Sequence, residues 1–347
     1  MNNVQFKACF VPLSQQNNGQ KTVDTVLKHF NKKILPFCKN LSKIDANFFI
    51  PAAGAGSRFK IAHKIGDYNK INMPLPTGKN PFYALDFVMM LSLPFIDNEG
   101  VQPLLSDKPN GSLGGIIDYY MAGNPIKDTV ICSGDSVFCG VTDKLRDDLL
   151  DTVQDKTVHC AVLCAQRTPK EVDSRYGIVL LNDKGIIKEF MEKPSYDIAC
   201  QHAIDGKNIV NTGCCYFSKD VMEHMLEELK SGSNPIKKDD VEMYDFGKSI
   251  EYVCSKMKDW FSEHQQNNPK IIMTDIWQDV GETDGFYKFL LTLKKNNIFN
   301  QLNVANAKEL QQEINSRVMQ EQQSIDFRKD RHKPFRNSNI DGINIMY

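Results

Sequence analysis

The 347-residue sequence predicts an α/β fold built on a mixed, mostly parallel sheet flanked by helices. From Ala46 onward, short apolar runs of strand length alternate with longer segments of helical periodicity. Parallel neighbours need long crossover connections, which helices supply, and such sheets are covered on both faces. A hairpin pattern at 176–194, with two β-rich runs around the turn Asn182–Gly185, adds an antiparallel part.

The expected strands are apolar and rich in β-branched or aromatic residues, and the expected helices repeat apolar residues at every third or fourth position. Glycine, proline and asparagine, which favour turns, separate them. In chain order we expect strands at 47–50, 101–105, 129–135, 158–165, 209–217 and 270–281, and helices at 80–93, 113–123, 142–153 and 283–295.

Three regions follow from these patterns. Residues 1–45 form an N-terminal helical extension, because apolar residues recur at helical spacing after a polar start. Residues 46–295 form the main domain, and residues 296–347 contain a Gln/Glu-rich helix at about 305–322 and a basic tail. The two terminal helices could pack on the core or on a second subunit, so a homo-oligomer is one of two arrangements left open.

The 42 basic and 43 acidic residues nearly cancel, so we expect no nucleic-acid partner and no anionic membrane surface as a partner. No apolar stretch approaches the ~20 residues that span a bilayer, and the first residues lack a secretory signal pattern. We therefore expect a cytoplasmic protein. The spacing of its ten cysteines and seven histidines fits neither a zinc site nor a disulfide framework, which indicates reduced, buried cysteines.

The loop AAGAGSR at 52–58, after the first expected strand, could bind phosphate. Gly54 and Gly56 allow backbone conformations that bring several N–H groups to an anion, and Arg58 adds charge and bidentate hydrogen bonding. The same residues also fit a tight turn, since the spacing matches neither the GxGxxG fingerprint nor the P-loop.

Lys70 and the loop GSLGG at 111–115 could complete a nucleotide site. Nearby prolines stiffen the Lys70 segment, so its ammonium could reach the phosphates that Arg58 contacts; the alternative is a solvated surface lysine. Gly111 and Ser112 precede an apolar helix whose positive N-terminal end could face a base or ribose. A flexible loop that caps the helix fits equally well.

Asp135 and Asp279 each follow an apolar strand, and open α/β sheets bind ligands at the carboxyl ends of their strands. Two carboxylates that converge beside a triphosphate would hold Mg²⁺, which prefers oxygen ligands. Either aspartate could instead be a turn or N-cap residue. Glu192 and Lys193 end a hairpin strand and could bind a ligand or form only a surface ion pair.

Together these elements resemble the sugar nucleotidyltransferases, the pyrophosphorylases that join a nucleoside triphosphate to a sugar 1-phosphate. The resemblance covers about residues 46–295 and rests on motifs that occur in the family's order. The matching residues are Gly54, Gly56, Ser57 and Arg58 in the first loop, Lys70, Asp135, Tyr176 and Gly177, Glu192, Lys193 and Pro194, Asn211, Thr212 and Gly213, and Trp277, Asp279, Val280 and Gly281.

Within this family, the segments SRYGIV, IKEFMEKP, DFGKSI and WQDVGETDGFY are most similar to the glucose-1-phosphate adenylyltransferases. The sequence departs from them in three places. Ile71 follows the lysine where a proline is usual, GSLGG replaces a glycine-threonine-alanine element, and the C-terminal part is too short for their left-handed β-helix domain.

The resemblance implies a Rossmann-like fold of the nucleotide-diphospho-sugar transferase type. It also implies in-line attack of a sugar 1-phosphate on the α-phosphorus of a nucleoside triphosphate, assisted by Mg²⁺, with ATP and glucose 1-phosphate as the first substrates to consider. Two alternatives remain open. One is a transferase with a non-sugar phosphate acceptor, and the other is a silent regulatory subunit that binds nucleotide sugars.

The resemblance further implies roles for individual residues. Arg58, Lys70 and Lys193 would be catalytic, and Asp135 and Asp279 would bind the metal. The nucleotide would contact Ala53, Gly54, Gly56, Ser57, Arg58, Gly111 and Ser112. The sugar phosphate would contact Tyr176, Gly177, Glu192, Lys193, Asn211, Thr212 and Gly213.

Overall fold

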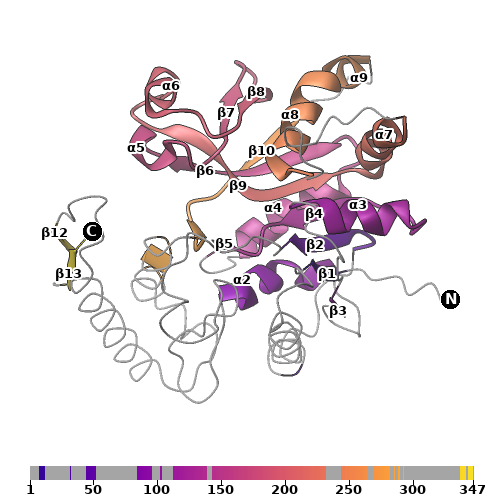
Figure 1. Cartoon of the computed structure of the whole chain (residues 1–347), viewed down its shortest axis with the longest axis horizontal. Coiled ribbons are helices and arrows are strands. Elements are labelled where there is room, and N and C mark those ends of the chain that lie inside the picture. Colours follow the sequence, from indigo (N-terminus) through magenta and orange to yellow (C-terminus); the bar gives the residue numbers. More distant parts are fainter. Residues whose placement is uncertain are drawn as a thin grey trace. The chain divides into compact units, whose positions relative to one another are not determined.

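The computed structural model describes the central part of the chain and short segments nearer its ends (Figure 1). The chain divides into two compact units. Unit 1 comprises Met1–Ala55 and Leu85–Trp277, and unit 2 comprises Gly56–Ala84 and Gln278–Tyr347. The described residues are 8–11, 32, 44–51, 84–95, 102–103, 112–138, 143–231, 244–263, 269–281, 285, 288, 289, 292, 337–340 and 343–346.

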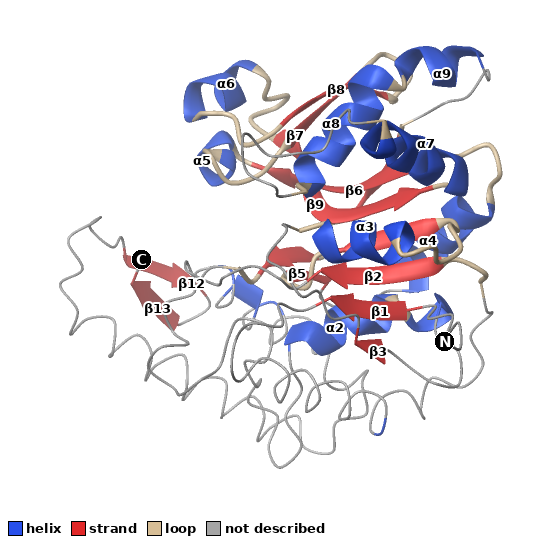
Figure 2. Cartoon of the chain, turned by 45° about the vertical axis from the view of Figure 1, so that its right-hand side comes forward, coloured by secondary structure: helices blue, strands red, loops and turns tan. Residues whose placement is uncertain are grey.

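Unit 1 contains a mixed nine-stranded sheet within its described residues (Figure 2). The strands are β1 (Ala8–Val11), β2 (Asn47–Pro51), β3 (Gln102–Pro103), β4 (Thr129–Cys132), β6 (Cys160–Arg167), β7 (Ile178–Leu181), β8 (Ile187–Met191), β9 (Asn208–Phe217) and β10 (Lys270–Met273). Along its main path the order is β10-β6-β9-β4-β2-β1-β3. Strand β9 runs antiparallel to β4 and β6, whereas the other neighbours on this path are parallel, which confirms the predicted α/β fold.

Strand β1 lies between β2 and β3, although the sequence analysis predicted only a helical extension before residue 46. Ala8 pairs with Phe48 and Val11 with Pro51 in parallel register. An apolar run of 4 residues is too short to reveal a period, so only its tertiary pairing identifies this strand. Most of the predicted extension lies outside the described residues.

The helices confirm those predicted at 80–93, 113–123 and 142–153. They are α2 (Ala84–Leu91), α3 (Gly114–Met121), α4 (Asp143–Gln154), α5 (Pro169–Val172), α6 (Tyr196–Gln201), α7 (Lys219–Lys230), α8 (Phe246–Lys256) and α9 (Lys258–Glu263), with a 3-10 helix at Leu93–Phe95. Helix α8 begins in the segment DFGKSI, for which the sequence analysis predicted no element. Its N-cap is Asp245, whose Oδ1 accepts a hydrogen bond from Lys248 N at 3.2 Å.

The hairpin predicted around Asn182–Gly185 is confirmed as β7 and β8. Asn182 closes the turn, because its side-chain Oδ1 accepts hydrogen bonds from Lys184 N and Ile186 N at 3.0 Å each. Gly185 adopts φ +73°, a left-handed conformation that glycine takes without strain. The hairpin joins the main sheet where Ile178 pairs with Val210 of β9.

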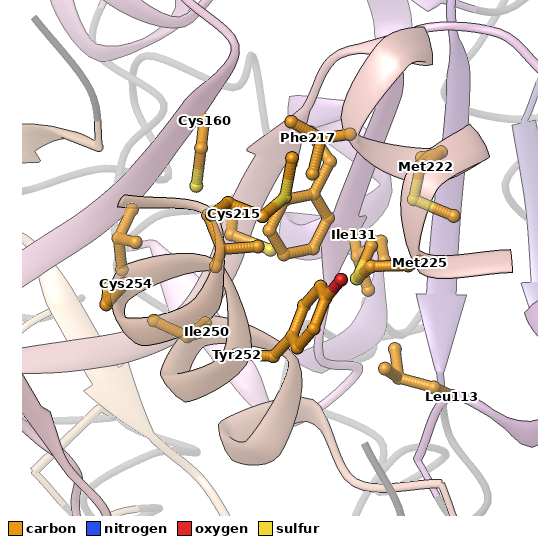
Figure 3. Packing of buried hydrophobic residues seen from close by; sticks show 14 of the residues in the cluster. Leu113, Ile131, Cys160, Cys215, Phe217, Met222, Met225, Ile250, Tyr252 and Cys254 are labelled. Atoms are coloured by element: carbon orange, nitrogen blue, oxygen red, sulfur yellow. The ribbon is translucent and has the colours of Figure 1, made fainter. Parts of the chain in front are cut away.

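At the centre of the sheet, in β2 and β4, the side chains on both faces are buried, as is usual for parallel strands covered by helices. Phe49, Ile131 and Cys215 pair across β2, β4 and β9, so their side chains share one face. That face packs against α3, α7, α8 and α9, and Figure 3 shows cluster residues of α7 and α8 beside the strands. Phe48 points to the opposite face, where its ring centroid lies 5.3 Å from that of Phe95.

Cysteine and methionine fill much of this core. Cys160 and Cys215 are fully buried, and burial raises the pKa of both thiols well above the usual range, so they stay uncharged. The free cysteines include Cys132, Cys160, Cys164, Cys200, Cys214, Cys215 and Cys254, of which Cys200 is exposed. The core therefore agrees with the expectation of reduced cysteines that pack as small apolar side chains.

Short elements lie outside this sheet. They are β5 (Ser136–Phe138), β11 (Trp277–Asp279), β12 (Asn337–Ile340) and β13 (Ile343–Met346), of which β12 and β13 form an antiparallel hairpin. Residues 285, 288, 289 and 292 are helical, in agreement with the helix predicted at 283–295, whereas the helix predicted at 305–322 lies outside the described residues. Within the described part of the chain, no helix is long and apolar enough to cross a membrane.

Candidate functional site

Asp135 lies on a tight turn at the carboxyl end of β4. Gly134 N donates to Pro51 O at 2.9 Å, which joins the turn to the end of β2. Ser136 N donates to Ser133 O at 3.0 Å, and Ser133 Oγ donates to the Asp135 carboxylate at Oδ1. The half-buried carboxylate is therefore held by its own turn at the strand end where the sequence predicted a ligand site.

Strand β9 bulges beside this turn. Between the pairs Val162–Cys215 and Cys164–Asn211 the register shifts, so extra residues of β9 stand opposite one residue of β6. Thr212 Oγ1 bridges the gap by donating to Leu163 O at 2.8 Å. Bulges redirect side chains, and this one takes Thr212 and Gly213 out of the regular ladder with β6, directly after Asn211.

Gly213, at the centre of the bulge, packs directly against the Asp135 turn. It adopts φ +79°, and an added Cβ atom would lie 2.8 Å from Ser136 Oγ and 3.2 Å from Ser133 Cβ. Ser133 N donates to Gly213 O at 2.7 Å, and Ser136 Oγ donates to Thr212 O. Both the conformation and the space at this position require glycine.

Asn211 connects the bulge to the start of the hairpin. Its side-chain Oδ1 accepts from Gly213 N at 2.8 Å, and its backbone N donates to Gly177 O at 2.9 Å. Gly177 in turn packs against β8, since an added Cβ would lie 2.3 Å from Phe190 Cζ and 2.9 Å from Glu192 Oε2. The Tyr-Gly, Asn-Thr-Gly and Glu-Lys elements of the sequence are therefore neighbours.

The carboxylate of Glu192 lies at the N-terminal end of α8. An added Cβ on Gly247 would lie 2.5 Å from Glu192 Oε2, so the carboxylate fills the space that this glycine leaves. On its other side, Lys193 Nζ lies 2.8 Å from Glu192 Oε1. The Glu192 side chain, a hydrogen-bond acceptor, therefore lies between a helix N-terminus and an ammonium, both of which attract negative charge.

Lys193 has a strained backbone. Its φ is +46°, and Ser174 nearby has φ +55°. Ser174 N donates to Pro194 O at 2.9 Å, so the two left-handed residues belong to one hydrogen-bonded junction. Conformations of this kind in residues other than glycine cost of order 1–3 kcal/mol and are concentrated at functional sites.

We call these residues of unit 1 the polar cluster: Asp135, Tyr176, Gly177, Glu192, Lys193, Asn211, Thr212 and Gly213. A continuous path of contacts links them, from Asp135 through Ser133 to Gly213, then through Asn211 and Gly177 to Glu192 and Lys193. All residues predicted to contact the sugar phosphate, together with one predicted metal ligand, thus belong to the same cluster.

Tyr176 extends the cluster through an aromatic contact. Its ring centroid lies 5.2 Å from that of Trp277, with the planes at 72°. The guanidinium of Arg175 lies 5.4 Å from the Tyr176 ring centroid, and that of Arg167 lies 4.6 Å from the Trp277 centroid. Cations over aromatic faces are favourable, so each ring of the pair gains a stabilising contact with one arginine.

The remaining predicted residues are placed differently. Asp279 belongs to unit 2, where its Oδ1 accepts from Gly281 N at 2.7 Å, the turn interaction that the sequence left open. Ser112 is exposed, and its Oγ accepts from Phe246 N at 2.9 Å, at the start of α8. Outside the described residues lie Ala53, Gly54, Gly56, Ser57, Arg58, Lys70 and Gly111.

Sequence reasoning missed several residues that build this site. Ser133 and Ser136 fix the aspartate turn, Gly247 makes room for Glu192, and Arg167 holds Trp277. Of these residues, Gly247 alone had a signal in the sequence. It lies in the segment DFGKSI, which is similar to the adenylyltransferases, but the sequence analysis assigned it no role. Among the described residues, no group of three or more His, Cys, Asp or Glu side chains could hold a metal ion.

The described part of the chain is thus an α/β fold with a mixed sheet, and its polar cluster includes the turn at the carboxyl end of β4. A family model described as Nucleotidyl transferase matches residues 96–296, more than half of the chain. The chain therefore belongs to the nucleotidyl transferase family, and the match confirms the resemblance inferred from the motifs.

Two curated relatives are similar over about half of the chain. The glucose-1-phosphate adenylyltransferase of Mycoplasma mobile is 27% identical over 168 residues, which cover 48% of this chain and 37% of the relative. Glucose-1-phosphate adenylyltransferase 2 of Vibrio parahaemolyticus is 24% identical over 177 residues, 49% of this chain and 39% of the relative. The matches thus span well under half the length of both relatives.

Among solved structures, the inositol-1-phosphate CTP transferase from T. maritima is similar with a TM-score of 0.46 and 12% sequence identity. The match covers 84% of this chain and 98% of that chain.

Proposed function

We propose that the protein transfers a nucleotidyl group from a nucleoside triphosphate to a sugar 1-phosphate, forming a nucleotide sugar and pyrophosphate. The observation that carries this proposal is the contact path of the polar cluster. A phosphorylated sugar needs a cation for its phosphate and hydrogen-bonding groups for its hydroxyls. The cluster offers both within a few residues, because the Lys193 ammonium and the Glu192 carboxylate are adjacent.

On the acceptor side, Lys193 would bind the sugar phosphate, and Glu192 would accept hydrogen bonds from the sugar hydroxyls. Tyr176, Gly177 and the segment Asn211–Gly213 would line the rest of this subsite. Gly177 and Gly213 let these elements pack closely, because a side chain at Gly177 would collide with Phe190 and Glu192, and one at Gly213 with Ser136.

On the nucleotide side, Arg58 and Lys70 would neutralise the triphosphate and the leaving pyrophosphate. Ala53, Gly54, Gly56 and Ser57 would supply backbone and hydroxyl groups around it, and Gly111 with Ser112 would lie beside the base or ribose. The support for these roles is the order of the motifs in the sequence. We further propose a cytoplasmic location, and a homo-oligomer remains a prediction from the two terminal helices.

Mg²⁺ is the cofactor that this reaction calls for, because it neutralises charge on the two phosphorylated substrates when bound. Asp135 and Asp279 would hold it. Both are carboxylates, the oxygen donors that Mg²⁺ prefers, and Asp135 lies on a hydrogen-bonded turn that fixes its position. Since Mg²⁺ usually takes one or two carboxylates from a protein, the small number of acidic groups in the cluster fits this ion.

The proposed reaction forms one bond and breaks one. A phosphate oxygen of the sugar 1-phosphate attacks the α-phosphorus, and the bond from that phosphorus to the bridging oxygen breaks, so the electron pair leaves with pyrophosphate. The protein needs no covalent intermediate. Its residues would align the two anions and offset their repulsion, which is where catalysis of phosphoryl and nucleotidyl transfer mostly arises.

Pyrophosphate release tests the proposal. The protein is incubated with MgCl₂, each common nucleoside triphosphate and a panel of acceptors: several sugar 1-phosphates, with inositol 1-phosphate and phosphocholine as non-sugar acceptors. Release that requires a sugar 1-phosphate supports the proposal. Release only with a non-sugar acceptor contradicts it, as does nucleotide-sugar binding without any release, which would identify a silent regulatory subunit.

A matched pair of lysine variants gives the control. Lys193→Asn removes the ammonium while keeping a residue that tolerates φ +46°, and Lys184→Asn removes an exposed lysine from the turn of the same hairpin. We expect Lys193→Asn to lower kcat/KM by about 10²–10³-fold, as for other charge-stabilising groups, and Lys184→Asn to change it little.

A further inference from the structure

Arg167, the last residue of β6, holds Trp277 by two different contacts. Its Nη2 donates to the Trp277 carbonyl oxygen at 2.7 Å, and its Cζ lies 4.6 Å from the centroid of the indole ring. Nη1 of the same guanidinium donates to Gln166 O at 2.8 Å, which fixes the arginine to its own strand. Arg167 therefore restrains both the backbone and the side chain of Trp277.

The course of the chain explains why this restraint is needed. Strand β10 follows β6 in parallel register as far as the pair Met273–Cys164, and Thr274 N donates to Cys164 O at 2.8 Å. Beyond Thr274 the chain leaves the ladder of β6. Arg167 attaches the chain to β6 again at Trp277, where unit 1 ends.

Trp277 is also the link between this segment and the polar cluster. Its side chain is only 2% exposed, and its ring contacts Tyr176 at a centroid distance of 5.2 Å. The chain then continues within β11 to Asp279, the residue proposed to bind the cation. A shift of Trp277 would therefore be passed on to both Tyr176 and Asp279.

We propose that Arg167 is a positioning residue that fixes Trp277 and thereby sets the position of the Asp279 carboxylate. The inference rests on the proposed function, because the position of Asp279 matters only for cation binding and nucleotidyl transfer. Lysine could not replace Arg167. Only a planar guanidinium can stack on the Trp277 indole and at the same time donate a hydrogen bond to the backbone carbonyl oxygen of Trp277.

Fluorescence provides a readout that is independent of activity. The sequence contains two tryptophans, so in a Trp260→Phe background Trp277 is the only one left. In that background we compare the unchanged Arg167 with Arg167→Met and Arg167→Lys. The control is Lys170→Met, which removes an exposed lysine from α5. We expect acrylamide to quench Trp277 more strongly in both Arg167 variants than with Arg167 unchanged, and to the same extent in the control. Thermal unfolding is measured on every sample.

Cation affinity provides the second readout, with Mn²⁺ alone as the probe and electron paramagnetic resonance as the measurement. We expect Arg167→Met to weaken Mn²⁺ binding by about tenfold, within the range for residues that orient metal ligands, and Lys170→Met to leave it unchanged. In turnover assays, the Mg²⁺ concentration for half-maximal rate should rise in parallel. If Arg167→Met fails to fold, Arg167→Lys carries the same comparisons.

The outcomes separate this inference from the proposed function. Unchanged quenching in both Arg167 variants, or unchanged Mn²⁺ affinity, overturns the inference even if the wild type is fully active. Absence of Mn²⁺ binding by the wild type also overturns it. A third outcome is that no acceptor supports turnover, while the Arg167 variants bind Mn²⁺ more weakly and acrylamide quenches their Trp277 more strongly. In that case the positioning role of Arg167 stands and the proposed reaction fails.

Discussion

Strand β9 contains two segments that differ in regularity and in role. Its C-terminal end, Cys215–Phe217, pairs in regular register with β4 and β6 and buries apolar side chains against the helices (Figure 3). Its middle bulges between Asn211 and Cys215 and contacts the Asp135 turn through Thr212 and Gly213. We infer that the regular end stabilises the fold, whereas the bulge arranges polar groups.

The largest expected effect is a loss of turnover on substitution of Asp135, which contacts the bulge of β9 through its turn. Asp135→Asn should lower kcat by about 10²–10³-fold, equal to about 3–4 kcal/mol, because it removes the charge that would hold the cation. The amide oxygen can still accept the hydrogen bond from Ser133 Oγ, so the thermal midpoint should change little. The measurement is pyrophosphate release together with thermal unfolding. Near-normal turnover would remove Asp135 from the catalytic machinery.

The opposite pattern is expected for the core. Met225 of α7 is 1% exposed and lies in the cluster beneath β9, so Met225→Ala should lower the free energy of unfolding by about 3 kcal/mol through the cavity that it leaves. The KM for both substrates should stay unchanged at temperatures where the variant is folded. Urea unfolding and steady-state kinetics measure the two quantities. A large change in KM with little loss of stability would break the division of roles.

A glycine pair separates the effect of close packing from that of backbone conformation. Gly213 and Gly185 have φ +79° and +73°, but an added Cβ meets Ser136 Oγ at 2.8 Å in the first and nothing within 4 Å in the second. We expect Gly185→Ala to cost about 1 kcal/mol for the left-handed conformation alone, and Gly213→Ala about 2 kcal/mol or more. Only Gly213→Ala should also lower turnover. Equal costs and equal activities would show that the bulge tolerates a side chain.

The smallest expected effect is on the free energy of unfolding, through the left-handed backbone of Ser174. Ser174→Gly should raise the free energy of unfolding by about 0.5 kcal/mol, because glycine adopts φ +55° without the penalty of an L-residue. Ser255→Gly, in the exposed part of α8, should lower it by about 0.5 kcal/mol, because glycine disfavours helices. Chemical denaturation of both variants checks the two signs. A loss of stability in Ser174→Gly would contradict the strain at this junction.

Much of the fold could be predicted from the sequence because its elements are long enough to show a period. Strands such as β9 and β6 and the hairpin turn at Asn182 carry clear local signals. Strand β1 does not, since a run of 4 apolar residues fits several structures until its partner in the sheet is known. Helix α8 was not predicted either, although aspartate, its N-cap residue at position 245, commonly marks the start of a helix.

The site was predicted less completely, for a physical reason. The residues predicted from motifs carry charges or glycines in recognisable order, and the polar cluster contains those predicted to contact the sugar phosphate. The residues that hold them act through tertiary contacts without a sequence pattern. Arg167 and Trp277 are far apart in the chain, and nothing local in the sequence indicates that a guanidinium at the end of β6 contacts that indole.

The most direct test of the central claim is a crystal structure of the protein with glucose 1-phosphate. If the polar cluster binds the acceptor, the phosphate should lie about 3 Å from the Lys193 ammonium, with sugar hydroxyls donating to Glu192. A phosphate bound away from Lys193, with the Glu192–Lys193 ion pair unchanged at 2.8 Å, would contradict the account.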